Sequence, residues 1–130
     1  MSMRERLLEA LTNRGCDPKT DEDGDIVFLQ NRLTFLIVLE EEDPQFVRLL
    51  LPAIWRIGDP DEIDGARLAA MEVSKRVKLA RVFMLDDDES VWIGADGYVF
   101  CDTSLGELLD RLIACSLRAR DVFIETMMGG

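Results

Sequence analysis

Two long apolar runs with a short acidic break between them limit most strongly what this chain can fold into. The runs, residues 33–39 and 46–55, are rich in β-branched, leucine and aromatic side chains, which suit a pleated sheet. The break is Glu40-Glu41-Glu42-Asp43-Pro44, a composition typical of a turn. Residues 32–57 are therefore predicted to form a long antiparallel hairpin. Neither run alternates cleanly between apolar and polar residues, so both strands are predicted to be buried on both faces.

The rest of the chain has periodicities that predict three helices and three further strands. Two of the helix starts carry capping boxes, Ser2 with Glu5 and Ser104 with Glu107. The expected helices cover residues 2–13, 60–77 and 103–126, and the further strands cover 25–29, 79–85 and 91–95. Loops or turns are expected at 17–25, 86–90 and 96–97. Residues 98–101 are expected to extend or follow the last strand. The predicted class is α+β, a single domain over residues 1–130. Its antiparallel five-stranded sheet has the order α-β-β-β-α-β-β-α.

The balance of charged residues narrows the kinds of partner. The chain has 26 acidic and 15 basic residues among its 130, a net charge of −11. Such a surface repels phosphates, so nucleic-acid binding is not expected, whereas a basic protein segment would be attracted. Solubility alone explains the acidity equally well, and the sequence leaves both interpretations open.

Hydropathy gives an expected location. No apolar run reaches about 18 residues, so a membrane-spanning helix is not expected. The N-terminus leads into a charged amphipathic segment instead of an apolar signal region, so the expected compartment is the cytoplasm.

The chain lacks the usual catalytic residues. It contains no histidine, which removes every Ser-His or Cys-His nucleophile pair. A carboxylate-only mechanism remains possible but needs two facing acids, and the acids of this chain gather in predicted turns. We therefore predict that the protein is not an enzyme and has no catalytic residues.

No motif for a metal or cofactor stands out, and none is predicted. Neither of the glycine-rich phosphate-binding motifs, G-x-G-x-x-G and G-x-x-x-x-G-K-[ST], occurs in the sequence. Residues 21–25 have the alternating acids of a calcium loop, but Gly24 is misplaced and no glutamate follows at the twelfth position. Cys16, Cys101 and Cys115 are odd in number and lack C-x-x-C spacing, so neither a disulfide nor a zinc site is expected.

The two tryptophans, Trp55 and Trp92, each close an apolar strand. Stacking on a ligand is one interpretation of such residues. Packing in the core or at an interface is the interpretation that the strand context favours.

The order of predicted elements resembles the class I type III secretion chaperone fold. A closer likeness is to the bacterial sensory transduction regulator family, which shares that fold. The resemblance is carried by Asp23-Gly24-Asp25, by residues 46–52 (FVRLLLP), and by residues 69–82 (AAMEVSKRVKLARV) followed by an acidic turn and Val91-Trp92-Ile93. It extends over nearly the whole chain.

The resemblance implies a bacterial protein that works by binding. Chaperones of this fold are homodimers without cofactors, and they hold segments of a secreted effector. Their pairing surface is typically the middle helix and a neighbouring strand, here residues 63–77 and 79–85. The expected function is thus a chaperone-like dimer that binds a partner segment, and the alternative is a regulatory or adaptor domain without a secreted client.

The predicted interface combines this likeness with the apolar pattern of the chain. One sheet and three helices leave it doubtful that a single subunit covers both faces of the hairpin, and Pro52 suggests an edge or a bulge. Some of Val47, Leu49, Leu51 and Trp55 are therefore predicted to be exposed in one chain and covered by a partner. The predicted dimer or partner interface comprises Val47, Leu49, Leu51, Trp55, Ala66, Ala70, Val73 and Val77.

Overall fold

A computed structural model describes the fold over residues 1–85, 89–100 and 104–129. The helices are α1 (Met3–Asn13), α2 (Glu62–Arg76) and α3 (Leu105–Met127), and the strands are β1 (Lys19–Thr20), β2 (Ile26–Gln30), β3 (Leu33–Leu39), β4 (Phe46–Arg56), β5 (Ala80–Met84) and β6 (Ser90–Tyr98). Both predicted capping boxes are confirmed at the backbone, because Ser2 accepts from the Glu5 amide and Ser104 accepts from the Glu107 amide. Parts of three predictions lie outside the described residues: most of the turn at 86–90, the end of the segment 98–101 at Cys101, and the start of the helix 103–126 at Thr103.

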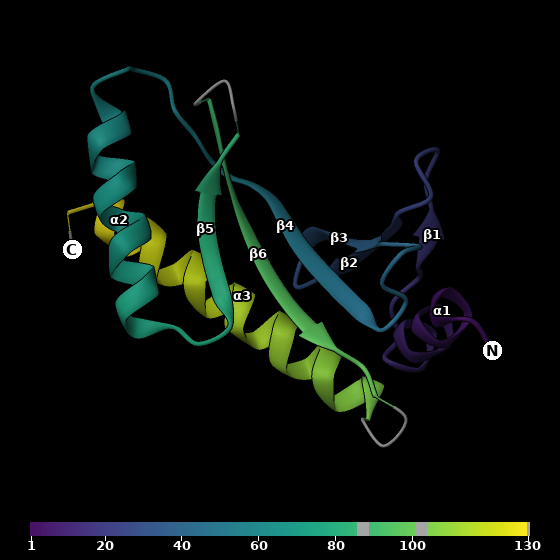
Figure 1. Ribbon diagram of the computed structural model, residues 1–130. Helices are drawn as coiled ribbons and strands as arrows, with labels where there is room; N and C mark the ends of the chain where they lie inside the picture. The colour runs from purple at the N-terminus through teal and green to yellow at the C-terminus, as the bar shows by residue number, and fades with distance from the viewer. Residues whose placement is uncertain (86–88, 101–103, 130) are drawn as a thin grey trace.

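The strands form one antiparallel sheet in the order β1-β2-β3-β4-β6-β5 (Figure 1). The long helix α3 runs behind the central strands, and α2 lies beside β5, where it packs against both β5 and α3. Helix α1 lies toward the other end of the sheet and also contacts α3. The helices thus form one layer on one face of the sheet, which confirms the general α+β class.

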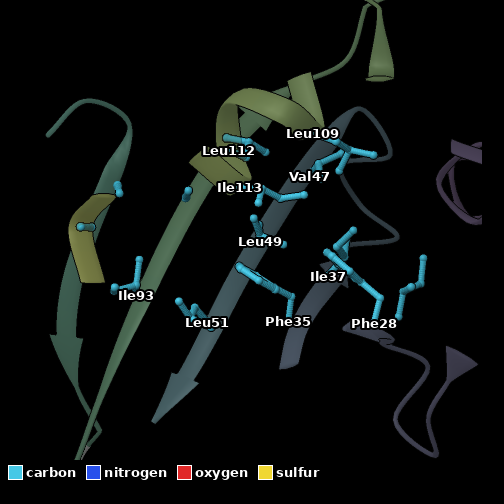
Figure 2. Packing of buried hydrophobic residues seen from close by; sticks show 14 of the residues in the cluster. Phe28, Phe35, Ile37, Val47, Leu49, Leu51, Ile93, Leu109, Leu112 and Ile113 are labelled. Atoms are coloured by element: carbon cyan, nitrogen blue, oxygen red, sulfur yellow. The ribbon is translucent and has the colours of Figure 1, made fainter. Parts of the chain in front are cut away.

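The core lies between this helix layer and every second side chain of the strands. The residues that the strands contribute are Ile26, Phe28, Phe35, Ile37, Val47, Leu49, Leu51, Val91, Ile93 and Ala95. Figure 2 shows Val47 and Leu49 gathered below Leu109, Leu112 and Ile113 of α3. Burying each large aliphatic side chain contributes roughly 2 kcal/mol of transfer free energy, so the packing of α3 against the sheet and α2 is a main source of stability.

Over the described residues the sheet has six strands instead of the predicted five, and the element order changes accordingly to α-β-β-β-β-α-β-β-α. The additional strand, β1, lies in the segment predicted as a loop and pairs with β2 through Lys19–Val27 and Thr20–Ile26. Both β1 residues are exposed, and a strand of two residues is too short to have any periodicity. Its pairing depends on β2 being present beside it, which local sequence cannot reveal.

The predicted turn at Asp96-Gly97 is also wrong, because β6 runs through both residues to Tyr98. Asp96 stands opposite Arg48 of β4, and two arginines neutralise its carboxylate. A Cβ on Gly97 would lie 2.9 Å from Leu108 Cδ1, so the absence of a side chain there lets α3 approach the strand. In this chain the Asp-Gly pair serves packing and charge, not a turn.

The predicted burial of the hairpin requires two corrections. The two strands are not buried on both faces, because burial alternates along β4. Some of Val47, Leu49, Leu51 and Trp55 are predicted to be exposed, but the first three are buried by the helix layer of the same chain and Trp55 is half-buried. The side chains between them, Arg48 and Leu50, are the ones left partly open. Within the described residues one face of the hairpin does lack a covering helix, but it is the face opposite Val47, Leu49 and Leu51.

The second half of β4 is interrupted by a bulge at Pro52 and Ala53, as Pro52 suggested. The pairing with β6 shifts register between Leu51 and Trp55, and Ala53 has a φ of 50°. After the bulge Trp55 is half-buried, with its ring edge-on to Phe123 at 6.2 Å. The bulge thus turns Trp55 toward α3.

The bulge makes a prediction that a pair of identical substitutions can test. An L-residue in the left-handed region costs about 1 kcal/mol, so Ala53→Gly is expected to raise the free energy of unfolding by up to that amount. The matched control is Ala114→Gly at an exposed position inside α3, which is expected to lower it by about 1 kcal/mol. Urea denaturation of both variants measures the difference. A destabilised Ala53→Gly protein would contradict the assigned bulge geometry.

Candidate protein-binding surfaces

The face of the sheet opposite the helices is not covered by any helix in the described part of the chain. We call it the open face, and its side chains are Val27, Leu29, Thr34, Leu36, Val38, Phe46, Arg48, Leu50, Arg81, Phe83, Trp92, Asp96 and Tyr98. Most are apolar or aromatic and are half-buried only by their neighbours. A sheet face of this composition is a site where a protein partner can dock.

The centre of the open face holds an ion network across three strands. Arg81 Nη1 on β5 lies 2.7 Å from Asp96 Oδ2, and Arg48 Nε on β4 lies 3.3 Å from Asp96 Oδ1. The Arg81 guanidinium lies over Gly94, where a Cβ would be 3.0 Å from Arg81 Nη2. Glycine at that position therefore allows Arg81 to lie flat across β6 and reach Asp96.

Aromatic rings flank this network. The Arg48 guanidinium lies 5.1 Å from the centroid of Phe46, and the Arg81 guanidinium lies 5.9 Å from that of Phe83. Phe83 in turn packs beside Trp92 at a centroid distance of 6.4 Å. Both face arginines are thus engaged by a carboxylate and by a ring.

The end of the open face near the β3–β4 turn is aromatic and acidic. Tyr98 lies 5.3 Å from Phe46 and 6.2 Å from Phe100, measured between ring centroids. The Tyr98 hydroxyl donates a hydrogen bond to Asp43 Oδ2 at 3.1 Å. This hydrogen bond, together with the negative charge of Asp43, raises the pKa of Tyr98 above its ordinary value.

A second surface is the free edge of the sheet at β5. Within the described residues β5 pairs with β6 alone, so its outer backbone groups are left without a strand partner. A groove of about 310 Å³ lies between this edge and α2, and we call it the edge groove. Its lining residues are Ala66, Arg67, Ala70, Met71, Val82, Phe83 and Met84. Leu68 and Met71 of α2 are 64% and 58% exposed, so the groove continues onto an apolar stripe of the helix.

Charge differs sharply between the α2–β5 segment, residues 65–85, and the rest of the chain. Residues 65–85 contain five basic residues and one acidic residue, a local net charge of +4. The remaining residues hold 10 basic and 25 acidic ones. The α2–β5 region is therefore a basic area on a strongly acidic protein.

The structure separates the residues predicted to form an interface. Ala66 and Ala70 line the edge groove, whereas Val73 is on the buried side of α2. Val77 is half-buried at the end of α2, and Trp55 is half-buried with its Nε1 donating to Glu62 Oε2 at 3.3 Å. Val47, Leu49 and Leu51 lie in the core and are not available to a partner. The predicted set therefore contributes Ala66 and Ala70 to an accessible groove.

Sequence reasoning missed the open face and its network. Arg48 lies on the same face of β4 as Phe46 and Leu50, and Asp96 lies on the same face of β6 as Tyr98. A charged residue at such a position, two residues from an aromatic one, is the sequence signal of this face. The pairing of Arg48 with Asp96 across 48 residues depends on the register of β4 and β6, which only the fold supplies.

The acidic segment at residues 21–25 forms a compact turn. One carboxylate oxygen of Asp21 accepts from the amides of Asp23 and Asp25, which brings the three side chains within 4.8 Å of one another. Burial and then the two neighbouring acids raise the pKa of Asp25, while Arg4 opposes them. The hydrogen bonds of the turn account for this arrangement.

Comparisons with known proteins identify the fold but no family. No family model matches the chain, and no curated protein matches it. The crystal structure of YbjN from E. coli, described as "a putative transcription regulator", matches with a TM-score of 0.70 and 12% identity over 93% of this chain and 88% of that one. An uncharacterised protein from Methanothermobacter thermautotrophicus matches with a TM-score of 0.64 and 12% identity over 98% and 97%.

These likenesses show a YbjN-like α+β fold. At 12% identity they carry no function across, and neither protein is described as a secretion chaperone. No helix of the described residues is long and apolar enough to cross a membrane.

The contact between Tyr98 and Asp43 predicts a tyrosine titration above the usual pKa of about 10. Tyr98 is the single tyrosine of the chain, so absorbance at 295 nm reports it alone. Because the folded pKa is raised, the contact stabilises the fold below the ordinary pKa and is lost as pH rises through the folded value. Asp43→Asn is expected to move the titration back toward about 10. Glu42→Gln, a neighbouring acid without this contact, is the control, and an equal shift in both variants would contradict the assignment.

Proposed function

We propose that this chain is a non-enzymatic regulatory or adaptor protein that binds other protein chains, beginning with a second copy of itself. The observation that carries the proposal is the free edge of β5 beside the edge groove. An unpaired strand edge is a template for another strand, and backbone hydrogen bonds across it add affinity without requiring a particular sequence. The exposed side chains of Leu68 and Met71 beside this edge supply apolar area for a partner.

Charge order along the chain favours an antiparallel pair of β5 strands. Lys75, Arg76 and Lys78 precede β5, and residues 86–89, which follow it in the sequence, are all acidic. In an antiparallel pair, the basic approach to one strand lies beside the acidic exit from the other. A parallel pair would bring like charges together. The self-complementary arrangement is also the one that a two-fold dimer requires.

The small residues of α2 fit the same interface. Ala66 and Ala70 line the groove without filling it, so an apolar side chain of a partner can enter between α2 and β5. Among the described residues no acidic side chain lines the edge groove, which supports binding over a carboxylate-dependent reaction. The likeness of the fold to a protein described as a transcription regulator supports the regulatory alternative over the secretion-chaperone function.

The proposed dimer predicts a particle of twice the 14.7 kDa chain mass. Size-exclusion chromatography with light scattering at micromolar concentration measures it. The double variant Leu68→Glu/Met71→Glu places charge in the apolar stripe and is expected to weaken the dimer at least tenfold, because two carboxylates must then be buried. Circular dichroism should remain unchanged, since both side chains are exposed in the single chain.

The matched control is Leu29→Glu, which carries the same change on β2. Leu29 is 64% exposed, as Leu68 is, but it lies far from β5 in the strand order. It should leave the dimer intact. A parent protein that is strictly monomeric, or a dimer lost equally in the control, would overturn the proposed interface.

A further inference from the structure

We propose that a second, separate site binds an arginine or lysine side chain from a basic segment of a partner protein. The site is the aromatic platform formed by Phe46, Tyr98 and Phe100 at the acidic end of the open face. The platform does not use the β5 edge, so the proposal stands without the proposed dimer.

The platform exposes aromatic rings to an unusual degree. Tyr98 is 49% exposed and Phe100 is 53% exposed, and their rings are nearly parallel, with an interplanar angle of 16°. Phe46 adds a third ring at 5.3 Å from Tyr98. Large aromatic rings are usually mostly buried, so a cluster of half-exposed ones marks a docking surface.

Carboxylates border the same rings. The β3–β4 turn holds four acidic residues in sequence, from Glu40 to Asp43. Asp43 accepts a hydrogen bond from the Tyr98 hydroxyl, and Glu40 Oε1 lies 3.7 Å from Arg48 Nη1. Glu41 and Glu42 are exposed and form no ion pair with the described residues, so their charges are available to an incoming cation.

Aromatic faces beside carboxylates are the chemistry that attracts a cation. A guanidinium or ammonium group over a ring gains roughly 0.5–2 kcal/mol, depending on exposure. The structure already contains one such contact at the platform, because Arg48 lies 5.1 Å from the Phe46 centroid. Tyr98, with Asp43 at its hydroxyl, and Phe100, stacked on Tyr98, extend the aromatic surface beyond that contact. A cation of a partner therefore has ring faces and carboxylates within reach together.

Charge complementarity selects a basic protein segment as the occupant. The chain outside residues 65–85 has 25 acidic against 10 basic residues, so an acidic segment or a nucleic acid would be repelled. The face arginines offer little to an anion, because Arg48 and Arg81 are both held by Asp96. A segment that places arginine or lysine on the rings, with small or apolar residues beside it, satisfies both the aromatic and the acidic parts of the site.

The test is a titration of the full chain with a tetra-arginine peptide spaced by glycine and serine, followed by NMR chemical shifts. The largest shifts are expected at Phe46, Tyr98 and Phe100. Phe100→Ser is expected to weaken binding about fivefold to tenfold. Leu29→Ser removes a comparably exposed apolar side chain from the same sheet face and should leave affinity unchanged. Equal losses in the two variants would overturn the site.

A second pair of variants separates the local acids from overall charge. Glu41→Gln/Glu42→Gln is expected to weaken the peptide, whereas Asp121→Asn/Glu125→Gln removes the same charge from exposed positions of α3 and should not. Helix α3 begins at Leu105, five positions after Phe100 of the platform. Asp121 lies 16 positions further on, or about 24 Å along the helix at 1.5 Å per residue. Equal weakening in both double variants would show diffuse attraction to an acidic surface and would overturn the proposal.

Two further measurements test the kind of occupant and its independence from the dimer. Tetramethylammonium binding as tightly as the peptide would identify a small quaternary ammonium as the ligand, contrary to the proposal. Self-association of the peptide-free parent that Phe100→Ser abolishes would identify a second copy, again contrary to it. The monomeric Leu68→Glu/Met71→Glu variant is expected to bind the peptide as the parent does, which separates this site from the proposed dimer.

Discussion

Packing of helix α3 against one face of the sheet determines most of what this molecule can present to others. Its buried residues, among them Leu109, Leu112 and Ile113, cover β4 and β6 and thereby fix which parity of each strand is interior. Because side chains alternate along a strand, covering one face leaves the other parity outside. The open face is therefore a consequence of having the helices in one layer. A face that contacted only solvent would be expected to carry mostly polar side chains, whereas most side chains of the open face are apolar or aromatic.

The ion network of Arg48, Asp96 and Arg81 makes such a face possible. A wholly apolar open sheet would risk edge and face association, whereas charged side chains on it oppose non-specific contact. The network also explains why β6 continues through Asp96-Gly97: the carboxylate finds two guanidiniums across the strands, and Gly97 makes room for Leu108. Interactions between residues far apart in the sequence thus override a local turn signal.

Local signals predicted the helices, the capping serines of α1 and α3, the hairpin, and an edge or a bulge at Pro52, because each depends on neighbours within a few residues. The sequence did not reveal β1, whose pairing depends on β2, or the length of β6. Ala66 and Ala70, predicted to belong to an interface through the small-residue stripe of α2, line the edge groove, and their role in an interface stays a prediction. The sequence assigned Val47, Leu49 and Leu51 to an interface because an apolar run alone does not say which parity the helix layer covers. The paired arginines and the aromatic platform required the strand register.

The two proposed surfaces can be occupied at the same time. In an antiparallel pair of edge strands the two-fold axis stands perpendicular to the sheet, so the open faces of both copies point the same way. Phe46 and Tyr98 of the platform lie on the interior strands β4 and β6, and Phe100 follows β6, so the β5 edge can pair without covering the platform. The acidic platform attracts a basic partner segment, whereas the β5 edge pairs with the same edge of a second copy. An adaptor built in this way would hold two copies together at one edge while each copy presents its platform on a common side.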